Sequence, residues 1–176
     1  MTPWRRTFLL LFLLSLLVGG GVAWFLYDRY RIAPEPEWAA LPLETYDGRP
    51  VDAAAWAGRP TLVTFWQTWC PPCRAEMPHL AAVAEIMAPE GLRAVVVSDE
   101  PMPLLLRHMD LVPERLERLR VPSLQALDVY TFPTTVLYDA RGRVVFKTTG
   151  VLDGTPLAVA EDFRRRLGAS PGTGER

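Results

Sequence analysis

The sequence is poor in cysteine and histidine and has no long block of one charge. Its 176 residues include two Cys and two His and carry a formal net charge of −1. Two cysteines cannot build a framework of several disulfides. The small net charge and the lack of a basic block argue against a nucleic-acid-binding surface. The densest basic run, residues 164–166, is expected to be a solvated helix end.

A structural zinc site is also excluded by the residues available. Such a site needs four ligands at characteristic spacings. The only Cys and His residues are Cys70, Cys73, His79 and His108. No second closely spaced pair accompanies the two cysteines, so we predict that the chain binds no metal and needs no cofactor.

A long uncharged run near the N-terminus predicts a membrane anchor. It extends from Thr7 to Tyr27 and would measure about 30 Å as a helix, the thickness of a bilayer core. A cleaved signal peptide is the alternative, because Gly21-Val22-Ala23 places small residues before a potential cut. Since the apolar run continues through Trp24-Phe25-Leu26, we expect residues 1–31 to be retained as a signal-anchor.

The remainder divides into a linker, one domain and a tail. Residues 32–42 are rich in proline and predict an extended spacer. Residues 43–167 have the size of one globular domain. Residues 168–176 contain Gly, Pro, Ser and Thr without an apolar pattern, so a disordered tail is expected there.

The apolar pattern of the domain predicts an α/β fold. Strands are expected at 61–66, 92–97, 135–138 and 143–147, after a short hairpin around Asp47-Gly48. Helices are expected at 71–87, 104–109, 114–119 and 155–167. The second and third of these helices lie in a stretch, 99–129, that prolines interrupt repeatedly. Strand, helix and strand between 61 and 97 predict a right-handed parallel βαβ unit.

Both cysteines lie where the first strand meets its helix. Unpaired amides and the helix dipole at that position favour a thiolate on Cys70. We therefore predict that Cys70 is the nucleophile and that Cys73, one turn later, attacks the mixed disulfide. Two inert thiols are the alternative, but the placement of the chain's only two cysteines at one junction argues against it.

Two further titratable side chains, Glu76 and His79, lie near the pair in the sequence. Glu76 follows Cys73 by three residues and so shares its side of the helix. Burial would raise its pKa and let it transfer a proton during exchange. An exposed glutamate stabilised by the helix dipole is the alternative. His79 is neither three nor four residues from either cysteine, and we interpret it as a surface or packing residue.

The run Leu62–Pro78, which contains Trp69-Cys70-Pro71-Pro72-Cys73, resembles the signature of a known family. It is similar to the TlpA/ResA-like, membrane-anchored thiol–disulfide oxidoreductases of the thioredoxin superfamily, a branch that includes cytochrome c maturation proteins. A second patch, Phe132–Asp139 with Gly142, resembles the cis-proline loop and following strand of that family. The resemblance spans roughly 41–167 and weakens between 99 and 129.

The resemblance implies a fold and a set of site residues. The fold is thioredoxin-like, with a central mixed β-sheet flanked by helices, here preceded by the expected transmembrane helix. Catalysis would fall to Cys70, Cys73 and Glu76. Substrate contacts would come from Trp69, Thr131, Phe132 and Pro133, with Pro133 in the cis form.

The function that the resemblance implies is reduction of disulfides in exported proteins, as in cytochrome c maturation or metal-centre assembly. A membrane dithiol donor would resupply the electrons. A thiol oxidase of the same fold is one alternative, because the residues alone do not fix the direction of electron flow. A Cu(I)-handling protein is another, since thiolates bind Cu(I), although copper chaperones of this fold space their cysteines one residue further apart.

The expected location follows from the redox pair. Arginines flank both ends of the uncharged run, so the positive-inside rule does not decide its orientation. A redox-active pair suits the oxidising side of a membrane. We therefore expect a single-pass protein of the inner (cytoplasmic) membrane, with its C-terminal domain in the periplasm or extracytoplasmic space.

Overall fold

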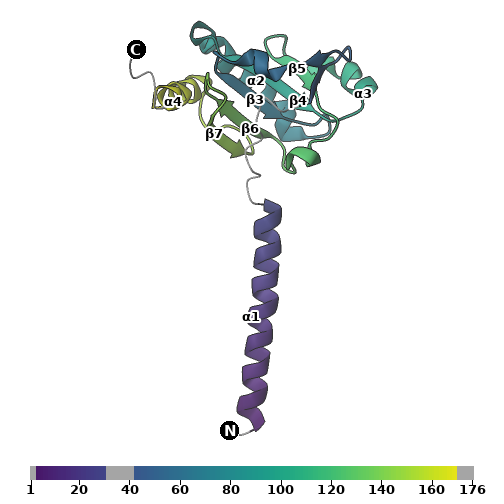
Figure 1. Ribbon diagram of the computed structural model, residues 1–176, viewed down its shortest axis with the longest axis vertical. Coiled ribbons are helices and arrows are strands. Elements are labelled where there is room, and N and C mark those ends of the chain that lie inside the picture. The colour runs from purple at the N-terminus through teal and green to yellow at the C-terminus, as the bar shows by residue number, and fades with distance from the viewer. Residues whose placement is uncertain (1–2, 31–41, 170–176) are drawn as a thin grey trace. The chain divides into compact units, whose positions relative to one another are not determined.

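The computed structural model describes residues 3–30 and 42–169 (Figure 1). Its two compact units, Met1–Ala33 and Pro34–Arg176, are described separately. The predicted linker falls on residues that lie outside the described part, apart from Pro42. The predicted tail also lies outside it from residue 170 onward, whereas residues 168 and 169 are helical.

The first unit is one helix, α1 (Pro3–Tyr30). Its large apolar side chains that are described, such as Leu17 and Trp24, are exposed. Among the described residues, no helix is both long and apolar enough to cross a bilayer. The predicted span Thr7–Tyr27 therefore finds no support in the structure, and some of its side chains lie outside the described part.

The second unit is built on one seven-stranded sheet in the order β2-β1-β5-β4-β3-β6-β7. The strands are β1 (Leu43–Thr45), β2 (Pro50–Val51), β3 (Thr61–Phe65), β4 (Arg93–Ser98), β5 (Glu117–Arg120), β6 (Thr134–Tyr138) and β7 (Val144–Thr149). The three central neighbours β5, β4 and β3 are parallel, and the other pairs are antiparallel. The predicted mixed sheet, its N-terminal hairpin and its four further strands are confirmed, and the two strands expected to be buried, β3 and β4, are buried.

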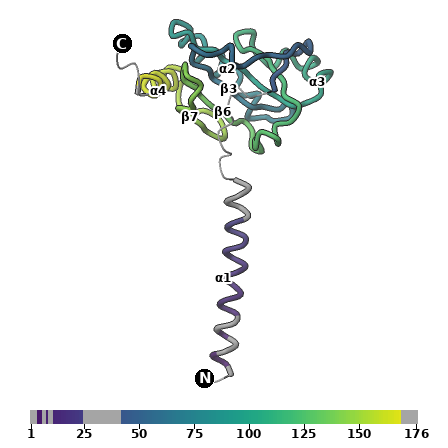
Figure 2. The backbone as a smooth tube through the Cα atoms, in the orientation of Figure 1, coloured from purple at the N-terminus to yellow at the C-terminus, as the bar shows by residue number. Residues whose placement is uncertain are grey.

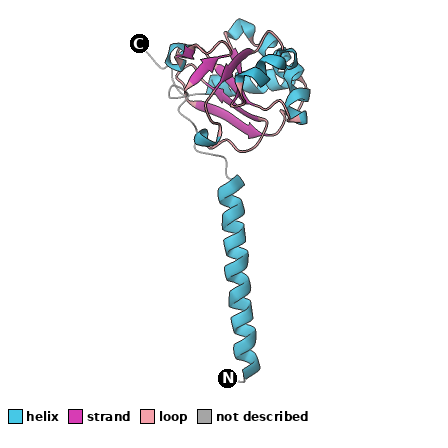
Figure 3. Ribbon diagram, turned by 90° about the vertical axis from the view of Figure 1, so that its right-hand side faces the viewer, coloured by secondary structure: helices cyan, strands magenta, loops and turns pink. Residues whose placement is uncertain are grey.

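The central strands β3, β4 and β6 are buried on both faces of the sheet. The helices are α2 (Pro71–Ile86), α3 (Met102–Arg107) and α4 (Pro156–Ala169). One core joins Leu62 of β3 to Leu80 of α2 and Phe163 of α4, and a second core contains the next residue of β3, Val63. Because successive side chains of a strand point to opposite faces, all five residues of β3 are buried, including Thr61 and Thr64. Figure 3 shows the strands as one layer with helices packed against it.

The predicted βαβ unit is confirmed by the parallel pairing of β3 with β4 around α2. The predicted C-terminal helix is confirmed as α4, and Thr155 accepts a hydrogen bond from Ala158 N–H at 3.3 Å as its N-cap. Figure 2 follows the chain from β7 into this helix. The redox motif thus lies at the carboxyl edge of the central strands, where β3 gives way to α2.

The helix predicted at 114–119 is wrong, because this stretch contains strand β5. Pro113 and Pro122 bracket it and leave too few residues for a stable helix. Within the strand, Leu119 is fully buried in one core and Arg118 and Arg120 flank it, half-buried. β5 fills the gap between β4 and β1, and these long-range partners decide its conformation. The helix predicted at 104–109 is confirmed in part as α3.

Candidate active site: the Cys70–Cys73 disulfide and its surroundings

The two cysteines form a disulfide at the start of α2, with their Cα atoms 5.3 Å apart. Cys70 is the N-cap residue of the helix, and its Sγ accepts a hydrogen bond from Cys73 N–H at 3.2 Å. Pro71 and Pro72 occupy the first helical positions, where the absent N–H costs no intrahelical bond. The predicted placement of the Cys70 sulfur at a helix N-terminus is confirmed.

This placement has a chemical consequence for the reduced pair. A thiolate on Cys70 would keep the Cys73 N–H as a donor and would sit at the positive end of the helix dipole. Both cysteines are almost completely buried, at 3% and 1% exposed. A partner therefore has to approach through the residues that surround the pair.

Glu76 lies one turn after Cys73 and is buried, so the interpretation as an exposed first-turn glutamate is wrong. Its Oε1 accepts a hydrogen bond from Leu152 N–H at 2.6 Å, whereas its buried Oε2 has no partner among the described residues. Burial raises the pKa of Glu76 above its ordinary value of 4.5, and the Leu152 hydrogen bond offsets part of that shift. Because its pKa is raised, the Glu76 carboxylate takes up a proton more readily than an exposed glutamate would, and it lies one helical turn from Cys73.

The cis-proline loop precedes β6, the antiparallel neighbour of β3. Phe132-Pro133 is a cis peptide bond, as predicted. Trp69 is 66% exposed, and its ring meets that of Phe132 edge to face, with centroids 5.9 Å apart. Thr131, also exposed, begins this loop and accepts a hydrogen bond from Thr134 through its carbonyl oxygen. The structure therefore brings the four predicted substrate-contact residues to the neighbourhood of the redox pair.

The segment after β7 links this loop to Glu76. Gly150 N–H donates to the Pro133 carbonyl at 2.8 Å, and two residues later Leu152 N–H holds Glu76. Sequence reasoning did not identify Leu152. A backbone donor gives no residue-type signal, so only the tertiary structure could reveal it.

Sequence reasoning also missed a polar cluster at the ends of β3 and β4. Ser98 is the last residue of β4, and Asp99 and Glu100 follow it. Their side chains bind Gln67 and Thr68 just before Trp69-Cys70. A signal was present, because carboxyl ends of parallel neighbours lie at the same edge of a sheet. Two acidic residues directly after a buried strand should therefore have been placed beside the motif.

His79 is half-buried, with its Nε2 buried and without a hydrogen-bond partner in the described part of the chain. Burial lowers its pKa below 6.5. This agrees with its interpretation as a packing residue. Over residues 3–30 and 42–169, no three Cys, His, Asp or Glu side chains lie together as a potential metal site.

A family profile and a curated relative both place the chain among thiol-based redox proteins. Residues 33–162 match the family profile described as Redoxin. The thiol-disulfide oxidoreductase ResA of Geobacillus thermodenitrificans is 28% identical over 170 residues, which cover 92% of each chain.

Solved structures show the same fold. The thiol:disulfide interchange protein DsbE of Chlorobium tepidum superposes with a TM-score of 0.60 at 21% identity, over 78% of this chain and 98% of the other. A secreted disulfide oxidoreductase of Mycobacterium tuberculosis gives 0.58 at 22% identity, over 77% and 99%. The thioredoxin-like fold that the sequence predicted is therefore confirmed.

Proposed function

Since the chain belongs to the Redoxin family and is a ResA-like thiol–disulfide oxidoreductase, we propose that it reduces disulfides in exported proteins through Cys70 and Cys73. The observation that carries this proposal is the disulfide at the N-terminus of α2, with buried Glu76 one turn beyond it. Assembly of cytochrome c or of a metal centre is the proposed setting.

The proposed reaction has two exchange steps. The Cys70 thiolate attacks one sulfur of the substrate disulfide, so a mixed disulfide forms and the other substrate sulfur leaves as a thiolate. Cys73 then attacks Cys70 Sγ, which releases the second substrate sulfur and forms the Cys70–Cys73 disulfide. Two electrons pass from the cysteine pair to the substrate.

Glu76 has an acid–base role in this scheme. Cys73 is buried and needs to lose its proton before it attacks. The nearby carboxylate, with its unpartnered Oε2 and raised pKa, accepts that proton. When a membrane dithiol donor re-reduces the pair, Glu76 returns the proton to Cys73.

Trp69, Thr131, Phe132 and Pro133 form the proposed contact surface for the substrate. The exposed Trp69 ring and its edge-to-face neighbour Phe132 offer apolar area beside the buried sulfurs. The loop before β6 offers backbone groups to an extended substrate segment.

The test of the reaction uses the full chain with a disulfide-containing protein substrate. We expect Cys70→Ser to abolish reduction, because the thiolate that attacks the substrate disulfide is lost. We expect Cys73→Ser to accumulate a mixed disulfide through Cys70, which non-reducing electrophoresis detects. Turnover by the Cys70→Ser variant at the wild-type rate would reject the assignment.

The direction of electron flow has its own measurement. A reduction potential of the pair near or below about −220 mV would support a reductase, and a value near −120 mV would indicate an oxidase instead. Equilibration of the full chain with glutathione or dithiothreitol buffers, followed by Trp69 fluorescence, gives this value. A Cu(I)-binding role without redox turnover receives no support from the oxidoreductase relatives.

Activity outside the cytoplasm is part of the proposal. It is supported by the redox chemistry of the pair and by the similarity to a secreted oxidoreductase. We further propose that residues 1–31 retain the chain at the inner membrane as a single-pass anchor, a hypothesis that rests on the uncharged run alone. Alkaline carbonate extraction and protease protection of intact spheroplasts test it, and release of a shortened soluble protein would indicate a cleaved signal.

A further inference from the structure

A buried polar network lies directly before the redox motif. Gln67 Nε2 donates to Asp99 Oδ1 at 2.6 Å, and Ser98 Oγ donates to Gln67 Oε1 at 3.3 Å. Thr68 donates twice to Glu100, from its N–H to Oε2 at 2.6 Å and from its hydroxyl to Oε1 at 2.7 Å. The segment after β4 therefore holds the segment after β3 by side-chain hydrogen bonds.

The Glu100 carboxylate is the centre of this network. It is 7% exposed, and each of its oxygens accepts a hydrogen bond from Thr68. The Ser98 hydroxyl, whose single proton is shared between Gln67 Oε1 and Glu100 Oε2, lies 3.3 Å from the latter. An arrangement of donors around both oxygens suits the ionised form, which only accepts. No ion pair to this carboxylate is found in the described part of the chain.

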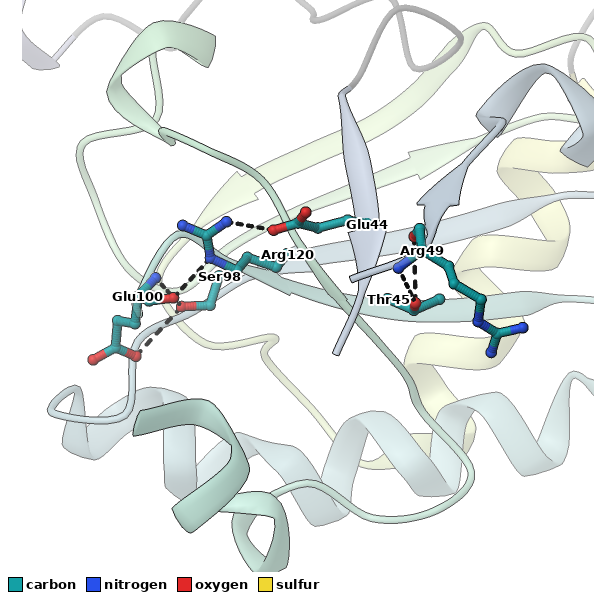
Figure 4. A network of polar contacts seen from close by, with 6 residues as sticks. All are labelled: Glu44, Thr45, Arg49, Ser98, Glu100 and Arg120. Atoms are coloured by element: carbon teal, nitrogen blue, oxygen red, sulfur yellow. Dashed lines mark hydrogen bonds and ion pairs between the residues drawn. The ribbon is translucent and has the colours of Figure 1, made fainter. Parts of the chain in front are cut away.

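Arg120 binds the backbone carbonyl of Glu100 and forms no ion pair with the Glu100 carboxylate among the described residues. Its Nε donates to the Glu100 carbonyl oxygen at 2.9 Å, and its guanidinium pairs with Glu44 of β1. Figure 4 shows Arg120 between Glu44 on one side and Glu100 with Ser98 on the other. The loop that carries Glu100 is thereby tied to β5 and β1, while its carboxylate stays directed to Thr68.

Thr68 connects this network to the reaction. It is buried, and both of its hydrogen-bond donors go to Glu100. The next residue, Trp69, is largely exposed and therefore gains little rigidity from packing. We propose that Glu100 is a positioning residue which, through Thr68, fixes the backbone that presents Trp69 and Cys70 to a substrate.

The same carboxylate places a negative charge near the nucleophile. Thr68 and Cys70 are two residues apart, so their Cα atoms are separated by at most about 7.6 Å. A like charge bound to the backbone two residues before the nucleophile disfavours the Cys70 thiolate and makes the pair a stronger reductant. This inference rests on the proposed redox role of the two cysteines.

The test compares Glu100→Gln with the wild-type full chain in the reduced state. The glutamine keeps an acceptor for Thr68 and removes the charge. We expect the Cys70 thiolate fraction at neutral pH, measured from the pH dependence of alkylation, to rise about three- to tenfold. The equilibrium constant against glutathione should change about tenfold toward the dithiol form, or about 30 mV. An unchanged alkylation profile and potential in the folded variant would overturn the proposal.

A second variant and a control separate the positioning role of Glu100 from the effect of its negative charge. Thr68→Val keeps the Glu100 charge but loses the hydroxyl contact, so protein-disulfide reduction should slow at least threefold without a rise in the Cys70 thiolate fraction. Unchanged reduction by Thr68→Val would reject the positioning role, even if Glu100→Gln failed to fold. Glu117→Gln is the control, because Glu117 of β5 pairs with Arg93 of β4, and wild-type values are expected. The alkylation assay measures the Cys70 thiolate without any disulfide exchange. A wild-type chain that reduced no disulfide would therefore reject the proposed function without affecting the alkylation result for Glu100.

Discussion

Glu76 and Glu100 are buried to a similar degree, at 4% and 7% exposed, but the two regions treat their carboxyl groups differently. At the α2 side, Glu76 receives one backbone donor from the loop after β7, and one of its oxygens stays unpartnered. At the end of β4, Glu100 receives donors on both oxygens. Burial alone therefore does not decide the role of a carboxyl group, because the donors around it determine whether it exchanges a proton or holds a segment.

The largest expected difference between the two regions is in stability. Glu100→Ala leaves two buried donors of Thr68 without an acceptor, and we expect a loss of about 3 kcal/mol. Glu76→Ala leaves only Leu152 N–H unpaired and also removes an unpartnered oxygen, so about 1 kcal/mol is expected. Urea unfolding at pH 7 measures both. Glu117→Ala serves as a control, and a greater loss for Glu76→Ala than for Glu100→Ala would reverse the comparison.

The next effect is the pH dependence of stability that Glu76 confers. Its pKa is raised in the folded state by burial, so the folded protein binds the proton more tightly than the unfolded chain does. The stabilising contribution is therefore complete below the ordinary value of 4.5 and is lost as pH rises through the folded-state pKa. We expect Glu76→Gln to remove this loss, on the order of 1 kcal/mol.

Unfolding free energies of wild type and Glu76→Gln at pH 4.5 and pH 8 give the measurement. The wild type should lose stability relative to the variant between these two values. Parallel curves for the two proteins would show that the Glu76 carboxyl does not couple to folding.

The smallest effect is expected at the outer end of the Glu100 network. Arg120 and Glu44 are partly exposed, at 23% and 31% of their side chains, so their ion pair contributes little. Arg120→Met should cost less than about 1 kcal/mol and leave disulfide reduction near the wild-type rate. A loss as large as that of Glu100→Ala would show that Arg120, and not the Thr68 contacts, holds the loop.

The accuracy of the sequence interpretation depended on whether the controlling contacts were local. The helix after Cys70 was predictable because prolines, the N-cap position and the apolar spacing all lie within the segment. Strand β5 was not, since Leu119 and Arg120 take their conformation from pairing with β4 and β1. The predicted cis form of Pro133 came from resemblance to a family and is confirmed.

By itself, the sequence determined the redox pair, its place at a strand-to-helix junction and the α/β class, because adjacent residues and short-range periodicity carry that information. Only the tertiary structure decided which oxygens of Glu76 and Glu100 are partnered. Those donors come from Leu152 and Thr68, 76 and 32 residues away in the chain. Side-chain type sets what a carboxyl group is able to do, but its solvation in the folded protein sets what it does.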